Sequence, residues 1–163
     1  MPKNVNRKGI FMEYIYIGIG GFFGAVLRYL ITIYFTKMYH TIFPFETFMI
    51  NILGSFLLSF IANFTMDEYE VNTNLRLAIT TGFIGAFTTF STFSMETINL
   101  LKAGKDYIAL SYIILSIFGG LLMSYLGFEF ADKTFDLLKE RKKEDNKYTV
   151  CGNWRNFWNN IEI

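Results

Sequence analysis

Cysteine and histidine are almost absent from this sequence of 163 residues. The single cysteine, Cys151, excludes an intramolecular disulfide, and the single histidine, His40, lies in a predicted loop, so a metal site of the Cys/His type is not supported. A formal net charge of +1 says nothing about nucleic-acid binding. The sequence also lacks a recognisable set of nucleophile, base and orienting group, which predicts that the protein is not an enzyme.

Charge is scarce in four apolar stretches of the sequence, which cover about residues 12–35, 45–65, 75–101 and 108–131. A hydrocarbon core of about 30 Å needs roughly 20 residues of helix, so each stretch is long enough to cross a membrane. The first stretch follows Arg7 and Lys8 but is too long for a signal peptide. Short connections make successive helices antiparallel, and an even number of spans places both termini on the same side. The sequence therefore predicts an all-α integral membrane protein with four transmembrane helices.

The composition changes near residue 132, where a charged run from Lys139 to Asp145 precedes an aromatic end. We therefore divide the chain into a four-helix transmembrane domain, residues 1–131, and a charged and aromatic C-terminal tail, residues 132–163. The length and polar content of the tail favour a disordered end, and a short interfacial helix is the alternative. The residues whose spacing indicates that helix are Trp154, Phe157, Trp158 and Ile161.

Hydroxyl-bearing residues crowd the middle of the third stretch, in the segment GFIGAFTTFSTFSME from Gly82 to Glu96. At about 100° per residue these hydroxyls fall on all sides of a helical wheel, so a regular helix would expose several of them to lipid. Irregular backbone at membrane depth is tolerated where protein buries it or where it lines an aqueous path. We therefore predict that residues 82–92 form a broken helix at a transport site.

The other three stretches carry small or polar residues at a spacing of four. Gly20 and Gly24 predict close packing of the first helix against a neighbour, and Arg28 extends this face. A snorkelling arginine near a helix end is the alternative for Arg28. On the second helix Asn51 is the best functional candidate, because its amide costs most to bury unpaired. The other residues on these faces, which could line a path or only join helices, are Ser55, Ser59, Tyr112, Ser116, Gly120 and Ser124.

These faces favour a path for a small anion over one for a cation. No lysine lies near the middle of a span, and Arg28 is the only central cation. Neutral N–H and O–H donors can replace the water around an anion, and the edge of a phenylalanine ring carries positive partial charge. Phe90 and Phe93 flank Ser91 and Thr92 and could present such edges, although phenylalanines at this spacing usually pack in a core.

Three motifs occur in order along the spans: GGFFGAVLRY from Gly20, NILGSF from Asn51, and GFIGAFTTFSTFSME from Gly82. Together they resemble the signature of the CrcB/Fluc family of fluoride channels. The resemblance implies a fluoride-selective passive channel in the bacterial cell membrane, which exports cytoplasmic fluoride and so reduces its toxicity. It also implies an antiparallel dimer with two pores and a structural sodium ion at its centre.

The resemblance implies roles for individual residues as well. Phe90 and Phe93 would contact fluoride through their ring edges. The backbone carbonyls of Gly85 and Thr88, freed by the helix break, would hold the sodium ion, which fits the preference of a hard cation for oxygen. The other residues of the pore would be Asn51, Ser91, Thr92, Tyr112 and Ser116.

Two further positions match the family pattern, and two depart from it. Arg28 and Glu96 match the family pattern and would have supporting roles, with Glu96 acting through a proton or by orienting hydroxyls. Ala86 stands where the family commonly has a second glycine, and a positive φ there would be strained. Glu46 stands where a glycine is usual, and it would repel anions if it faced the path.

Two other functions agree with four short spans. A small multidrug exporter needs an acidic residue within the membrane for proton coupling, and Glu96 is the candidate here. The second alternative is a non-conducting partner subunit of a heterodimeric fluoride channel.

Basic residues are concentrated on the side of the two termini, which predicts a fixed orientation with both termini inside. Such an orientation favours pairing with an oppositely oriented paralogue over a homodimer.

Overall fold

The computed structural model describes the backbone of residues 7–38, 41–66 and 72–159, and the side chains of residues 9–38, 41–65 and 72–141. Regular secondary structure within these ranges is helical throughout. The elements in chain order are α1 (Arg7–Met38), α2 (Phe45–Met66), α3 (Thr73–Leu77), the π-helix η1 (Ala78–Ile84), α4 (Gly85–Phe87), α5 (Phe90–Lys102) and α6 (Asp106–Asn159).

Four segments are long and apolar enough to cross a membrane, which confirms the predicted all-α class and the four spans. The third of them is composite, because α3, η1, α4 and α5 follow one another within it. The segments are Gly9–Met38, Phe45–Thr65, Thr73–Lys102 and Asp106–Arg141.

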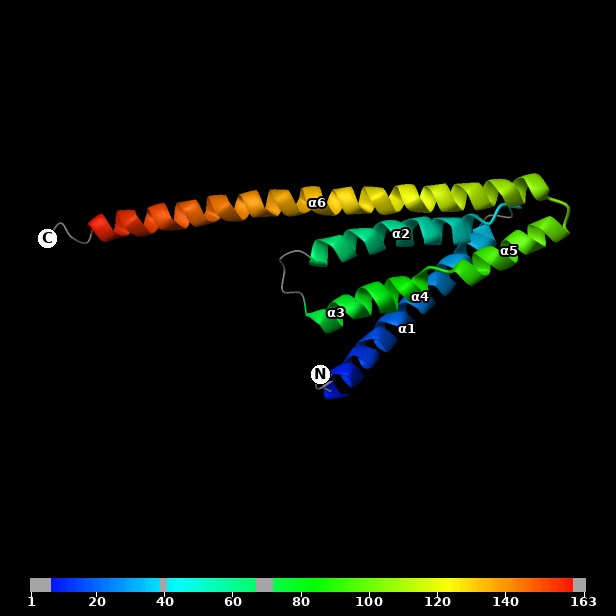
Figure 1. Ribbon diagram of the computed structural model, residues 1–163, viewed down its shortest axis with the longest axis horizontal. Coiled ribbons are helices and arrows are strands. Elements are labelled where there is room, and N and C mark those ends of the chain that lie inside the picture. Colours follow the sequence, from blue (N-terminus) through cyan, green and yellow to red (C-terminus); the bar gives the residue numbers. More distant parts are fainter. Residues whose placement is uncertain (1–6, 39–40, 67–71, 160–163) are drawn as a thin grey trace, which may run out of the picture.

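The third span changes its neighbours part-way along (Figure 1). In its first half, η1 and α4 pack against α1, whereas α5 in its second half packs against α6. The second span, α2, lies along α6 and also contacts η1, α4 and α5. The connection between α4 and α5 therefore lies where the third span passes from one neighbour to the other.

Glycines bring the backbones of α1 and η1 into direct contact. A Cβ atom at Gly20 would meet the carbonyl of Ala78, and one at Gly24 would meet the carbonyl of Phe83. From the other side, a Cβ at Gly82 would lie 2.6 Å from the carbonyl oxygen of Ile17. Small residues permit such an approach in membranes, where close packing replaces the hydrophobic effect as the force between helices. The close packing predicted for the first helix is confirmed.

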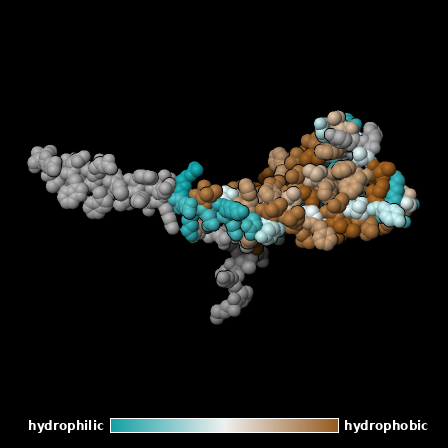
Figure 2. Space-filling view, turned by 90° about the horizontal axis from the view of Figure 1, so that it is seen from above, coloured by the Kyte–Doolittle hydropathy of each residue, from teal (hydrophilic) through white to brown (hydrophobic). Residues whose placement is uncertain are grey.

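Large apolar side chains cover the outside of the four spans. Figure 2 shows hydrophobic residues over most of the body, with hydrophilic residues gathered towards its two ends. Few side chains are fully buried, and rings such as Phe22 and Phe118 are more than 60% exposed. An apolar surface of this extent requires hydrocarbon or another subunit to cover it.

The fourth span continues far beyond the membrane domain. α6 has 54 residues, which at 1.5 Å per residue is about 80 Å of helix, against about 30 Å for a hydrocarbon core. Figure 1 shows its C-terminal part extending past the ends of the other helices. The disordered end expected for the tail is therefore wrong for residues 132–159, which continue α6 without a break; Ile161 lies outside the described residues.

Candidate functional site: a broken helix beside a polar pocket

The third span is interrupted at two residues. α4 ends at Phe87, and Thr88 and Thr89 adopt extended backbone, with φ/ψ of −74°/155° and −149°/108°, before α5 begins at Phe90. The break predicted within residues 82–92 is therefore present. No described residue other than glycine has a positive φ, so Ala86 lies within α4 without the strain that its position suggested.

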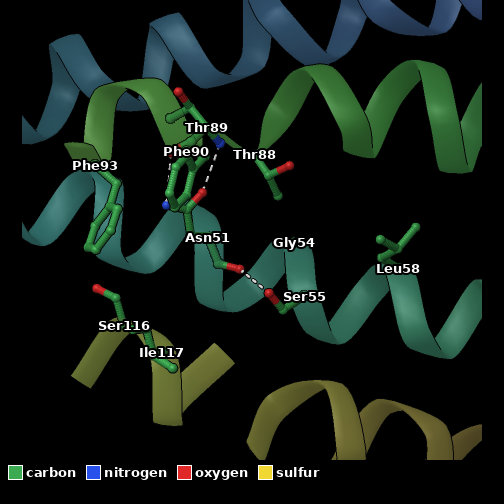
Figure 3. A pocket seen from close by; sticks show the side chains of 10 residues that line it. All are labelled: Asn51, Gly54, Ser55, Leu58, Thr88, Thr89, Phe90, Phe93, Ser116 and Ile117. Carbon is green, nitrogen blue, oxygen red and sulfur yellow. Dashed lines mark hydrogen bonds between the residues drawn. The ribbon is translucent and has the colours of Figure 1, made fainter. Parts of the chain in front are cut away.

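Asn51 on α2 binds both backbone groups of Thr89 (Figure 3). The backbone N–H of Thr89 donates to Oδ1 of Asn51 over 2.8 Å, and Nδ2 of Asn51 donates to the carbonyl oxygen of Thr89 over 3.2 Å. A primary amide can pair in this way because it carries both an acceptor and donors. The second N–H of the Asn51 amide is not needed for these bonds.

Thr89 itself caps the helix that follows. Its side chain is 6% exposed, and Oγ1 accepts a bond of 3.2 Å from the backbone N–H of Thr92. The hydroxyls of Thr92 and Ser91 lie 2.9 Å and 3.2 Å from the same oxygen. Sequence reasoning did not single out Thr89, although threonine is a favoured residue at the start of a helix.

These bonds release two carbonyls at the end of α4. In a continuous helix, the N–H of Thr89 would bond to the carbonyl of Gly85, and the N–H of Thr92 would bond to that of Thr88. Both N–H groups donate to side chains instead. The two carbonyls that the resemblance assigns to sodium are therefore among those from which the break withdraws the α-helical donor.

A glycine on α2 makes room for this backbone. A Cβ atom at Gly54 would collide with Cγ2 of Thr88, so α2 can approach the break only where it lacks a side chain. The Thr88 hydroxyl meanwhile donates to the carbonyl of Ile84 over 3.1 Å. Asn51 and Gly54, one turn apart on α2, together form the surface on which the break lies.

A pocket of about 280 Å³ opens beside the break. Phe90 and Phe93 form one wall, with ring centroids 5.7 Å apart and planes inclined by 42°. Phe90 is 79% exposed. The hydroxyl of Ser116 is buried and has no hydrogen-bond partner among the described residues. The full lining is Asn51, Gly54, Ser55, Leu58, Thr88, Thr89, Phe90, Phe93, Ser116 and Ile117, seen in Figure 3.

Glu96 joins three helices next to this pocket. Its Oε1 accepts a bond of 2.9 Å from Oγ1 of Thr47 on α2, and its Oε2 accepts one of 2.8 Å from the phenol of Tyr112 on α6. Tyr112 is completely buried, and its ring lies 5.0 Å from that of Phe93 and 5.2 Å from that of Phe43. The carboxylate thus connects α2, α5 and α6 behind the Phe93 ring.

The structure brings some of the predicted site residues together and leaves others apart. Asn51, Thr88, Phe90, Phe93 and Ser116 meet at the pocket. The predicted site residues that are not among its lining are Gly85, Ser91 and Thr92 near the break, Tyr112 and Glu96 behind Phe93, and Arg28, half-buried on α1.

Comparison with known proteins assigns this arrangement to a family. The family described as CrcB-like protein, Camphor Resistance (CrcB), matches residues 15–128, which run from within the first span to within the fourth and include the second and third spans completely. The chain belongs to the CrcB family. The match ends at residue 128, so the C-terminal part of α6 lies outside the portion that defines the family.

Curated relatives in the family carry the name of an ion channel. The fluoride-specific ion channel FluC 1 of Desulfitobacterium hafniense is 48% identical over 107 residues, which are 66% of this chain and 92% of that protein. FluC of Clostridium perfringens is 45% identical over 111 residues, 68% of this chain and 87% of the relative. FluC 2 of Listeria innocua is 42% identical over 122 residues, 75% and 92% of the two chains.

Proposed function

We propose that this protein is a fluoride-selective passive channel that exports cytoplasmic fluoride. The relatives named above carry the name of fluoride-specific ion channels, and the region that matches the family, residues 15–128, includes the pocket and the break. The observation that carries the proposal is the composition of the pocket wall. It combines phenylalanine rings with neutral hydroxyl and amide groups, and none of its lining residues is charged.

The pocket chemistry suits a small anion that moves through rather than binds tightly. The Ser116 hydroxyl and the remaining N–H of Asn51 are donors that can replace water around fluoride. The edges of Phe90 and Phe93 offer positive partial charge without a full cation. Conduction needs binding that is favourable enough for entry yet weak enough for exit, and a neutral wall meets both conditions.

An antiparallel dimer would complete the path. On a single chain the Phe90 ring is mostly exposed, and the pocket is open on one side. A second subunit against this face would cover the ring and supply the missing wall, and because each subunit would present such a face, one dimer would hold two pores. The partner is a second copy of this chain or an oppositely oriented paralogue, and the bias of basic residues towards the side of the termini favours the paralogue.

A sodium ion would occupy the centre of that dimer. The carbonyls of Gly85 and Thr88 lose their α-helical donors at the break, and carbonyl oxygen is a suitable ligand for a hard cation. When bound, the ion would neutralise carbonyl dipoles that lie at membrane depth. The residues of the break thus fit a structural sodium ion, which would hold the two halves of the third span together.

The bonds of Glu96 disfavour the multidrug exporter. Proton coupling in such a carrier requires an acidic group that faces the substrate path. Glu96 instead accepts bonds from Thr47 and Tyr112 on two other helices, and the pocket lining contains no acidic residue. The channel names of the relatives likewise agree with the prediction that the chain is not an enzyme.

The deciding experiment measures fluoride efflux from liposomes that contain the purified full-length chain, with chloride as the control ion. We expect rapid fluoride-selective efflux, and its loss in the Phe90→Ile and Phe93→Ile variants. Phe11→Ile is a matched control, because this ring is exposed on α1 and does not line the pocket.

Equal efflux of fluoride and chloride would contradict selectivity. Silence from the folded chain alone, followed by efflux after addition of an oppositely oriented paralogue, would identify this chain as an obligate subunit. Silence in both preparations would refute the channel.

A further inference from the structure

Two side chains replace backbone acceptors at the break. Oδ1 of Asn51 takes the N–H of Thr89, and Oγ1 of Thr89 takes the N–H of Thr92. These are the amides that an uninterrupted helix would direct to the carbonyls of Gly85 and Thr88. Each side chain therefore satisfies a backbone donor and, by doing so, leaves one carbonyl available.

We propose that Asn51 and Thr89 are positioning residues, whose bonds to the broken backbone hold the Gly85 and Thr88 carbonyls open for a cation. The inference rests on the sodium ion of the proposed function, and it assigns Asn51 a role beyond that of a pore donor. Neither side chain needs to touch the ion. Each acts through the backbone group that it occupies.

Asparagine suits this role at position 51 better than leucine or aspartate, which have a similar size. Its amide fixes the residue-89 backbone from both sides, through the N–H and the carbonyl oxygen of Thr89. Leucine has a similar volume but can replace neither bond, and aspartate retains only the acceptor. A buried N–H that loses its acceptor costs about 1–3 kcal/mol, which favours a return of the Thr89 N–H to the Gly85 carbonyl.

The environment of Thr89 supports the same reading. Its side chain is almost fully buried, and its hydroxyl oxygen collects one backbone N–H and lies within hydrogen-bond distance of two further hydroxyls. Gly54 contributes from α2, because any side chain there would displace Thr88. The open break thus depends on a specific set of neighbours rather than on its own backbone preference.

The test measures how sodium stabilises the protein. Thermal unfolding of the detergent-solubilised full-length chain is followed over a series of sodium chloride concentrations, with N-methylglucamine chloride keeping ionic strength constant. A ligand that binds only the folded state stabilises it by RT ln(1 + [L]/Kd), so the unfolding temperature begins to rise once the ligand concentration exceeds the Kd. We expect Asn51→Leu and Thr89→Val to raise the sodium Kd obtained from this dependence by about tenfold or more, and Thr89→Ser to retain the wild-type value.

Two matched controls separate this effect from a general loss of stability. Asn63→Leu removes an amide that bonds α2 to Asp132 on α6 over 2.8 Å, away from the break. Thr97→Val removes the hydroxyl of another buried threonine on α5, which bonds to the carbonyl of Phe93 over 2.8 Å. We expect both variants to lower the unfolding temperature without changing the sodium Kd obtained from its concentration dependence.

The outcomes distinguish this inference from the proposed function. Wild-type sodium dependence in folded Asn51→Leu and Thr89→Val would overturn the inference and leave the fluoride channel intact. If Asn51→Leu does not fold, the pair Thr89→Ala and Thr89→Ser decides, because equal sodium dependence in these two would also overturn it. Fluoride efflux from wild-type protein is measured in parallel. If wild-type protein shows no efflux but is stabilised by sodium, and the variants lose that stabilisation, the channel is refuted and the positioning role stands.

Discussion

The third span meets its two neighbours in different ways on either side of the break. Along α1, glycines at positions 20, 24 and 82 bring backbone against backbone without any polar side chain. Along α2 and α6, side chains reach across: Asn51 to Thr89, and Thr47 and Tyr112 to Glu96. The glycine contacts set how close two helices lie, whereas the polar contacts decide which backbone or carboxylate group points where.

A substitution at the glycine contacts between α1 and η1 should cause the largest loss of stability. In Gly24→Ala the new Cβ would collide with the carbonyl of Phe83, and neither backbone can move without separating α1 from η1. We expect a loss of about 3 kcal/mol in the free energy of unfolding, measured by denaturation in detergent micelles. Gly18→Ala on the same helix is the control, because a Cβ there meets no atom within 4 Å. Equal stability of the two variants would show that the α1–η1 contact is not tight.

At the polar contacts, the loss of a single hydroxyl oxygen should be enough to lower stability. Tyr112→Phe removes the phenol that donates to Glu96 and leaves the buried ring in place. Because a half-buried carboxylate then lacks one donor, we expect the free energy of unfolding to fall by about 2 kcal/mol in the same assay. Tyr107→Phe, at a residue that is 90% exposed, should change stability by less than about 0.5 kcal/mol. A similar loss in both variants would contradict the role assigned to the Tyr112 bond.

Gly54 combines the two kinds of contact, because it is a glycine on α2 that lies against a side chain of the break, and its substitution should cause the smallest loss of stability. Gly54→Ala places a methyl group against Cγ2 of Thr88, a side-chain atom that can adjust more easily than a backbone carbonyl. We expect a loss of about 1 kcal/mol, and its recovery in the double variant with Thr88→Ser, which removes Cγ2 and keeps the hydroxyl. The two substitutions should therefore be non-additive. Simple addition of their separate effects would mean that Gly54 does not accommodate Thr88.

The sequence could predict the spans, the break and the glycine contacts because each has a local signal. Long apolar stretches are membrane spans by length alone, and hydroxyls on all sides of a helical wheel are incompatible with a lipid-facing helix. The spacing of Gly20 and Gly24 likewise identifies a face for close packing.

The polar contacts could not be read in the same way. Asn51 was recognised as important, but an amide can serve a pore or a backbone group, and only the position of Thr89 distinguishes these uses. Thr89 itself depends on where the helix ends, because a shift of one residue would exchange its role with that of Thr88. The bond between Glu96 and Tyr112 joins two helices across a turn, and no periodic pattern marks such a pair.

The bond between Asn51 and Thr89 has a consequence for the order of assembly. α3, η1 and α4 follow one another without a gap as one helical segment from Thr73 to Phe87, so this half of the span can form before its neighbours are in place. The break after it is different, because the N–H of Thr89 finds its acceptor on α2 rather than within the third span. A newly made chain that has threaded all four spans through the membrane thus still lacks its pocket, which forms only when α2 comes to lie against the break.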